Sequence, residues 1–141
     1  MNHEVSKSDL EFLAAFEAGA YAPADFSHRA HVRLAYVYLA TNDVERATTL
    51  MRGAIVNFLR HHGIAHTKYH ETLTHAWILA VYHFMHRTPS ALSADDFIAR
   101  TPILLDSRIM LTHYSAERLF SPTARAAFVE PDLQPIPRHA A

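Results

Sequence analysis

What this chain lacks already limits its function. It has no cysteine, which excludes disulfides, zinc ribbons and thiol catalysis, and only 3 glycines, which favours helices over tight turns. No apolar run reaches the length that spans a membrane, and the first residues show no secretory signal. Lysine and arginine are scattered in a chain of net charge −1, so no basic surface for nucleic acid is expected. These absences predict a cytoplasmic protein that binds neither membranes nor nucleic acid.

The composition that is present favours one helical domain. Half of the 141 residues are hydrophobic, enough for a substantial core, and residues 1–141 are predicted to form a single domain. Apolar residues recur at helical spacing between capping residues and no strand alternation is seen, which predicts an all-α fold. The expected helices cover residues 8–19, 27–40, 42–62, 67–85, 93–100 and 103–114, the last with a break near 106–107, followed by short turns of helix from 115 and 121. The prediction is a compact bundle of about five main helices.

The C-terminal segment has a different character. Residues 130–141 carry three prolines, which hold the chain extended. Leu133 and Ile136 lie between these prolines and give the segment apolar side chains to bury. The sequence therefore predicts an extended, proline-rich tail that packs on the helical domain.

Histidine is the residue in excess, with 12 in the chain. In the expected fourth helix, His70 shares one stripe with Leu73, Trp77 and Val81, where apolar side chains face a core. Thr67 is the expected cap of this helix, so His70 falls in its first turn. An ionisable ring at the start of an apolar helix indicates a functional site.

Topology predicts that several histidines meet. Short connections make consecutive helices antiparallel, so the starts of the second and fourth helices lie at the same end of the bundle. That end collects His28 and His31, which are three residues apart on one helical face, together with His70 and Glu71. Near the positive end of a helix dipole an imidazole tends to stay neutral, and a neutral imidazole can bind a metal. We therefore predict His28, His31 and His70 as ligands of a transition metal ion, with iron, copper and zinc all suited to histidine and carboxylate ligands.

Two neighbours of His70 are predicted to take part in catalysis. Glu71 is a fourth ligand, an orienting group or the proton-transfer residue, and Tyr69 lines the pocket beside it. The prediction is a small metal-dependent enzyme that acts on a small metabolite, with oxidation favoured over hydrolysis. Buried histidines satisfied by carbonyl groups are common, and Glu71 could simply pair with Lys68 or His75.

Two other functions stay open at this stage. One is metal-free acid–base catalysis by His70 and Glu71, and the other is a small-ligand-binding or interaction module without catalysis. The second helix is apolar nearly all round, so it is either central to the bundle or covered by a partner, which leaves a homodimer open. No role is assigned to four further histidines: His62, His66, His75 and His113.

Two sequence segments carry a resemblance. The run Phe26-Ser27-His28-Arg29-Ala30-His31 and the run Lys68-Tyr69-His70-Glu71-Thr72-Leu73-Thr74, followed by Tyr114-Ser115 and Pro131-Asp132-Leu133, resemble a family of small all-helical bacterial proteins of unknown function. The similarity extends from about residue 26 to residue 137. It implies no particular activity, but it implies that His28, His31, His70 and Glu71 act as a unit.

Overall fold

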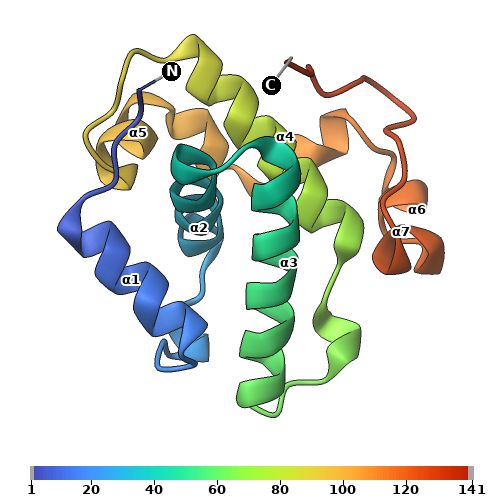
Figure 1. Cartoon of the computed structure of the whole chain (residues 1–141). Coiled ribbons are helices and arrows are strands. Elements are labelled where there is room, and N and C mark those ends of the chain that lie inside the picture. The colour runs from blue at the N-terminus through green and yellow to red at the C-terminus, as the bar shows by residue number, and fades with distance from the viewer. Residues whose placement is uncertain (1, 140–141) are drawn as a thin grey trace.

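The computed structural model describes residues 2–139, which form helices joined by short connections (Figure 1). The five main helices are α1 (Lys7–Glu17), α2 (His28–Thr41), α3 (Val44–His61), α4 (Glu71–Arg87) and α5 (Ala94–Arg100). The shorter pieces are η1 (Pro23–Asp25), η2 (His66–Lys68), η3 (Pro102–Leu105), η4 (Ser107–Thr112), α6 (Ala116–Leu119) and α7 (Pro122–Ala126). Residues 2–139 contain no strand, so the predicted all-α bundle is confirmed. None of their helices is long and apolar enough to cross a membrane.

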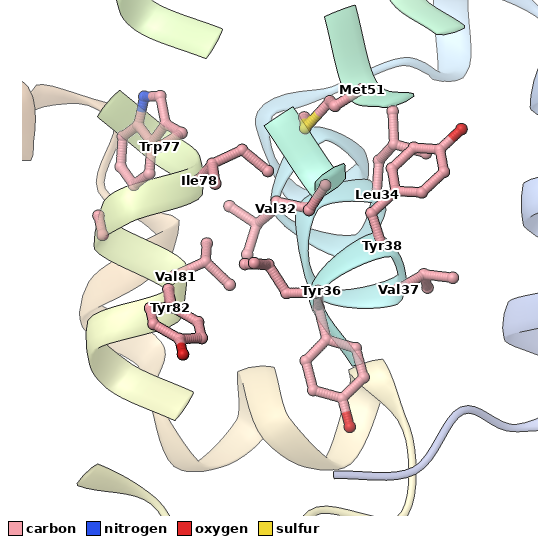
Figure 2. Packing of buried hydrophobic residues seen from close by; sticks show 14 of the residues in the cluster. Val32, Leu34, Tyr36, Val37, Tyr38, Met51, Trp77, Ile78, Val81 and Tyr82 are labelled. Atoms are coloured by element: carbon pink, nitrogen blue, oxygen red, sulfur yellow. The ribbon is translucent and has the colours of Figure 1, made fainter. Parts of the chain in front are cut away.

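Helix α2 lies at the centre of the bundle. It contacts α1, α3, α4 and α5, and its side chains are buried in every direction round the helix axis. Figure 2 shows Val32 of α2 facing Ile78 and Val81 of α4, while Tyr36 points toward another part of the fold. This central position accounts for the apolar residues on all sides of α2 without a partner chain. A homodimer stays a prediction.

The N-cap of helix α1 lies two residues earlier than the sequence predicts. Ser8, with Glu11 three residues on, predicts a capping box at residue 8, whereas in the structure Ser6 is the N-cap and Asp9 completes the box. Asp9 is buried and also accepts hydrogen bonds from the Ala94 N–H and from Arg33, so it ties α1 to α5 and α2. Both serines have an acidic residue three positions on, and these contacts with distant residues favour the register in which Asp9 points inward.

The predicted helix over residues 103–114 is two 3₁₀ helices, η3 and η4. The chain between them is extended at Asp106, whose carboxylate accepts the backbone N–H of Arg108. An aspartate that bonds to the backbone two residues on favours a turn over a continuous helix. The break lies where the sequence predicts it, but the two pieces are not α-helical.

The C-terminal tail packs along the outside of the bundle (Figure 1). The carbonyl of His113 accepts the N–H groups of Leu133 and Gln134, and Asp132 accepts both the N–H and the hydroxyl of Ser115. Ile136 is buried. The extended tail is therefore confirmed over the described residues up to 139.

Candidate functional site

His28 and His31 stand side by side on the first turn of α2. Ser27 begins the helix by accepting the N–H of Ala30 at 3.2 Å, which fixes the position of both rings. The ring centroids are 6.4 Å apart and the planes are nearly parallel, at 21°. The expected pairing on one helical face is what the structure shows.

Both rings line a cavity of about 400 Å³, which we call the histidine cavity. Its walls come from the start of α2, from α3 and from the start of α4, and they include Tyr69, His70 and Trp77. The structure thus brings His28, His31 and His70 to one cavity, as the antiparallel order of the helices predicts.

The His28 ring is fixed in one tautomer. Its Nε2 lies 2.8 Å from the carbonyl oxygen of Leu104, which can only accept, so Nε2 carries the proton. The other nitrogen, Nδ1, is unprotonated in the neutral ring and bonds to no group in residues 2–139. The ring also packs edge-on against Trp77, with centroids 4.5 Å apart. His28 therefore presents one hydrogen-bond acceptor at the cavity.

The ring of His31 makes no hydrogen bond to any group in the described part of the chain, although it lines the same cavity. Burial, followed by the neighbouring His28, lowers the pKa of His31 to about 4. The ring is therefore neutral at pH 7, with one N–H to donate and one nitrogen to accept.

Both ring nitrogens of His70 form hydrogen bonds with backbone groups. It is the N-cap of α4: its Nδ1 accepts the N–H of Leu73 at 3.1 Å, and its Nε2 donates to the carbonyl of Leu119 at 2.7 Å. The predicted cap, Thr67, lies instead in the 3₁₀ turn η2, which ends before α4 begins. Both ring nitrogens of His70 are thus occupied, and burial lowers the pKa of His70.

The predicted metal centre can be tested against this geometry. Within residues 2–139, no three His, Asp or Glu side chains are grouped so that they could hold one metal ion. His28 and His31 offer two nitrogens, but His70 would have to give up one of its two hydrogen bonds, the cap to Leu73 or the bond to Leu119, to become the third ligand. The residues as placed do not fit a three-histidine metal site.

Glu71 faces a different space from the three histidines. It lines a cavity of about 660 Å³, which we call the arginine cavity, formed by α3, η2, α7 and the start of α4. Arg52 donates to Glu71 through Nε at 2.8 Å and through Nη2 at 2.5 Å, and the Tyr69 hydroxyl donates at 2.6 Å. Burial alone would raise the pKa of Glu71, but the hydrogen bonds from Arg52 and Tyr69 outweigh it and the pKa is lowered. Glu71 is an ionised, fully occupied carboxylate.

Tyr69 is the one residue that the linings of the two cavities share. Burial, followed by the hydrogen bond to Glu71, raises the pKa of Tyr69, so its phenol keeps its proton at pH 7. Arg52 was not foreseen as part of this group. It lies 19 residues before Glu71, a separation at which only the packing of α3 against α4 reveals the pair.

The histidines without a predicted role have separate environments. His62 has a buried Nε2 without a partner in residues 2–139, His66 lines the arginine cavity, His75 packs on Phe128, and His113 bonds through Nδ1 to the carbonyl of Gln134. The sequence also gave no sign of the role of His3, which is buried and bonds to Met85 and Ala91.

Known proteins give no further guide to this site. No family model matches the sequence, and comparison with curated proteins and with solved structures finds no match either.

Proposed function

We propose that this protein binds a small metabolite in the histidine cavity without a metal ion, and that His28 accepts a proton from it. The observation that carries the proposal is the hydrogen-bonding state of the two rings: His28 has a free acceptor nitrogen, and His31 has two nitrogens without partners. A cavity of about 400 Å³ lies within the range of small-molecule sites.

The cavity favours a ligand that is partly apolar and carries hydrogen-bonding groups. The imidazoles of His28 and His31 can donate to and accept from a hydroxyl or an amide, and Lys68 lines the same cavity. Trp77 and Phe26 supply aromatic walls for an apolar body. A small alcohol or amide is therefore the chemical class that we expect.

The assignment of His28 rests on comparison with its neighbours. A general base works best with a pKa near the working pH, and the pKa of His31, at about 4, lies well below that. His70 has no free nitrogen, and Glu71 accepts three hydrogen bonds. His28 has a free nitrogen and a ring oriented by the Leu104 carbonyl, the arrangement that a proton acceptor needs.

Side-chain nitrogen NMR of the histidines tests this directly. The protein would be titrated with small alcohols and amides, and the expected result is a shift of the His28 and His31 ring nitrogens. His3 is the internal control, because it is buried and both its nitrogens are occupied inside the fold. Uniform shifts of all three rings, or shifts of His3 alone, would count against the proposal.

A metal-dependent reaction, with oxidation favoured over hydrolysis, is the second candidate. The observation in its favour is that His28 and His31 each have a free nitrogen and lie on one turn of α2. Metal analysis of untagged protein separates the two candidates. Stoichiometric iron, copper or zinc that disappears in both His28→Ala and His31→Ala would replace our proposal with the metal-dependent one.

A further inference from the structure

The arginine cavity has an excess of positive charge. Arg52 is neutralised by Glu71, which leaves Arg125 as the second guanidinium in the lining. Arg125 donates from Nη1 to the backbone carbonyl of Thr67 at 3.0 Å, and it forms no ion pair with a carboxylate in residues 2–139. The backbone bond holds the arginine at the cavity without cancelling its charge.

The rest of the lining is mostly apolar. Val56 of α3, Pro122 and Ala126 of α7, and Phe128 after it present hydrocarbon to the cavity. A positive group beside apolar walls suits a ligand with an acid at one end and hydrocarbon at the other. A guanidinium forms two parallel hydrogen bonds with a planar carboxylate, and a carboxylate on a hydrocarbon body is the simplest acid of this kind.

We propose that the arginine cavity is a second binding site, which takes a small carboxylic acid with an apolar body and pairs its carboxylate with Arg125. The site is distinct from the histidine cavity, because the two linings share no residue except Tyr69. Glu71 does not repel the ligand strongly, since its charge is already taken up by Arg52 and the Tyr69 hydroxyl.

Calorimetric titration with octanoate and with methyl octanoate tests the proposal, because the two probes differ in charge and share their hydrocarbon, and neither is an alcohol or an amide of the class expected in the histidine cavity. Octanoate is expected to bind the wild-type protein. A hydrogen-bonded charge pair contributes about tenfold or more to affinity. Arg125→Gln is therefore expected to weaken the binding of octanoate by that factor. The same variant should change the affinity for methyl octanoate by less than about twofold, because no charge is involved.

Matched variants keep the test specific. Arg46→Gln removes an exposed arginine of α3 that lines neither cavity, and it should leave octanoate binding unchanged. Phe128→Ala should weaken both probes, since it removes apolar wall. Arg125→Lys keeps the charge and should bind octanoate better than Arg125→Gln, which gives a second comparison should the glutamine variant unfold.

The outcomes that overturn the proposal are clear. They are an absence of octanoate binding to the wild-type protein, an equal loss of octanoate affinity in Arg46→Gln and Arg125→Gln, or an equal loss of affinity for both probes in Arg125→Gln. Octanoate is also expected to leave the His28 and His31 ring nitrogens unshifted. The result at this cavity is therefore independent of the result at the histidine cavity.

Discussion

His70 stabilises the backbone through hydrogen bonds at both of its ring nitrogens. It closes the first turn of α4 through one nitrogen and bonds the buried carbonyl of Leu119 through the other. Loss of an N-cap costs about 1 kcal/mol, and an unpaired buried carbonyl costs about 1–3 kcal/mol. The ring is therefore a substantial contributor to stability, whatever its part in binding.

The first prediction concerns this ring. His70→Ala should lower the free energy of unfolding by about 2–3 kcal/mol, measured by urea denaturation followed by circular dichroism. His70→Asn should lose less stability than His70→Ala, because asparagine is a good N-cap, although it does not reach Leu119. His66→Ala is the control, since His66 is exposed and should change stability by less than about 0.5 kcal/mol. Equal losses in all three variants would contradict the role of His70 as a cap.

The second prediction uses the pH dependence of His31. Its pKa is lowered from 6.5 to about 4, so between these values the unfolded chain binds a proton that the folded protein does not. The folded state should therefore be fully stabilised above pH 6.5 and lose about 3 kcal/mol of stability as the pH falls to 4. His31→Phe removes the titrating group, so its unfolding free energy should fall less steeply over this interval. Identical slopes for the two proteins would show that His31 titrates normally.

The third prediction concerns the pair of Arg52 and Glu71. Arg52 binds both carboxylate oxygens, but its side chain is 43% exposed, so solvent weakens the attraction. A double-mutant cycle with Arg52→Met and Glu71→Gln should give a coupling energy of about 1–2 kcal/mol. A coupling close to zero would mean that the Tyr69 hydroxyl alone orients Glu71.

At the scale of the helices, the three glycines give a graded test. Gly19 follows α1 at φ +76°, and a Cβ there would lie 2.5 Å from the His61 ring. Gly63 has φ +66° in open space, and Gly53 lies inside α3 with nothing within 4 Å and no positive φ. A left-handed conformation costs a residue with a Cβ about 1–2 kcal/mol, whereas alanine inside a helix gains about 0.5–1 kcal/mol over glycine.

The fourth prediction is the order of the three alanine variants in thermal unfolding. Gly53→Ala should melt above the wild type, Gly63→Ala below it, and Gly19→Ala lowest of all, because it combines the backbone cost with contact against His61. A Gly19→Ala protein as stable as Gly63→Ala would mean that the His61 ring moves aside without cost.

The helices themselves were largely readable from the sequence, because capping residues and apolar periodicity are local signals. The helices predicted over residues 27–40 and 93–100 have Ser27 and Ser93 as their N-caps, the first residue of each predicted range. The failures came where two local signals compete, as between Ser6 and Ser8 or between Thr67 and His70. In these cases contacts with residues far along the chain, such as Ala94 and Leu119, accompany the register that is adopted.

The site was readable only in part. The meeting of His28, His31 and His70 follows from helix order, which the sequence reveals through short connections. The hydrogen bonds of the His70 nitrogens cannot be predicted in this way, because the carbonyl of Leu119 comes from a short helix whose position depends on the whole fold. Arg52 was missed for the same reason.

At the scale of the whole molecule, the tail joins the last helices to the bundle. Ile136 is 4% exposed, whereas Leu133 in the same segment is 56% exposed, so only one of the two apolar side chains anchors the tail. The backbone bonds between the tail and His113 lie just before this anchor in the chain, at Leu133 and Gln134.

The fifth prediction separates these two side chains. Ile136→Asp should release the tail, which hydrogen exchange would detect as faster exchange at Leu133, while circular dichroism keeps its helical signal. Leu133→Asp is the matched control and should leave exchange in the tail unchanged. Equal exchange in both variants would show that the backbone bonds to His113 hold the tail without Ile136.

Tyr69 has a consequence for how the protein could change its range of ligands. One aromatic side chain contributes to the walls of two compartments, one lined with imidazoles and the other with guanidinium groups. A small residue at this position would enlarge both compartments at once. A single substitution would thus alter the size of the molecules that either compartment admits.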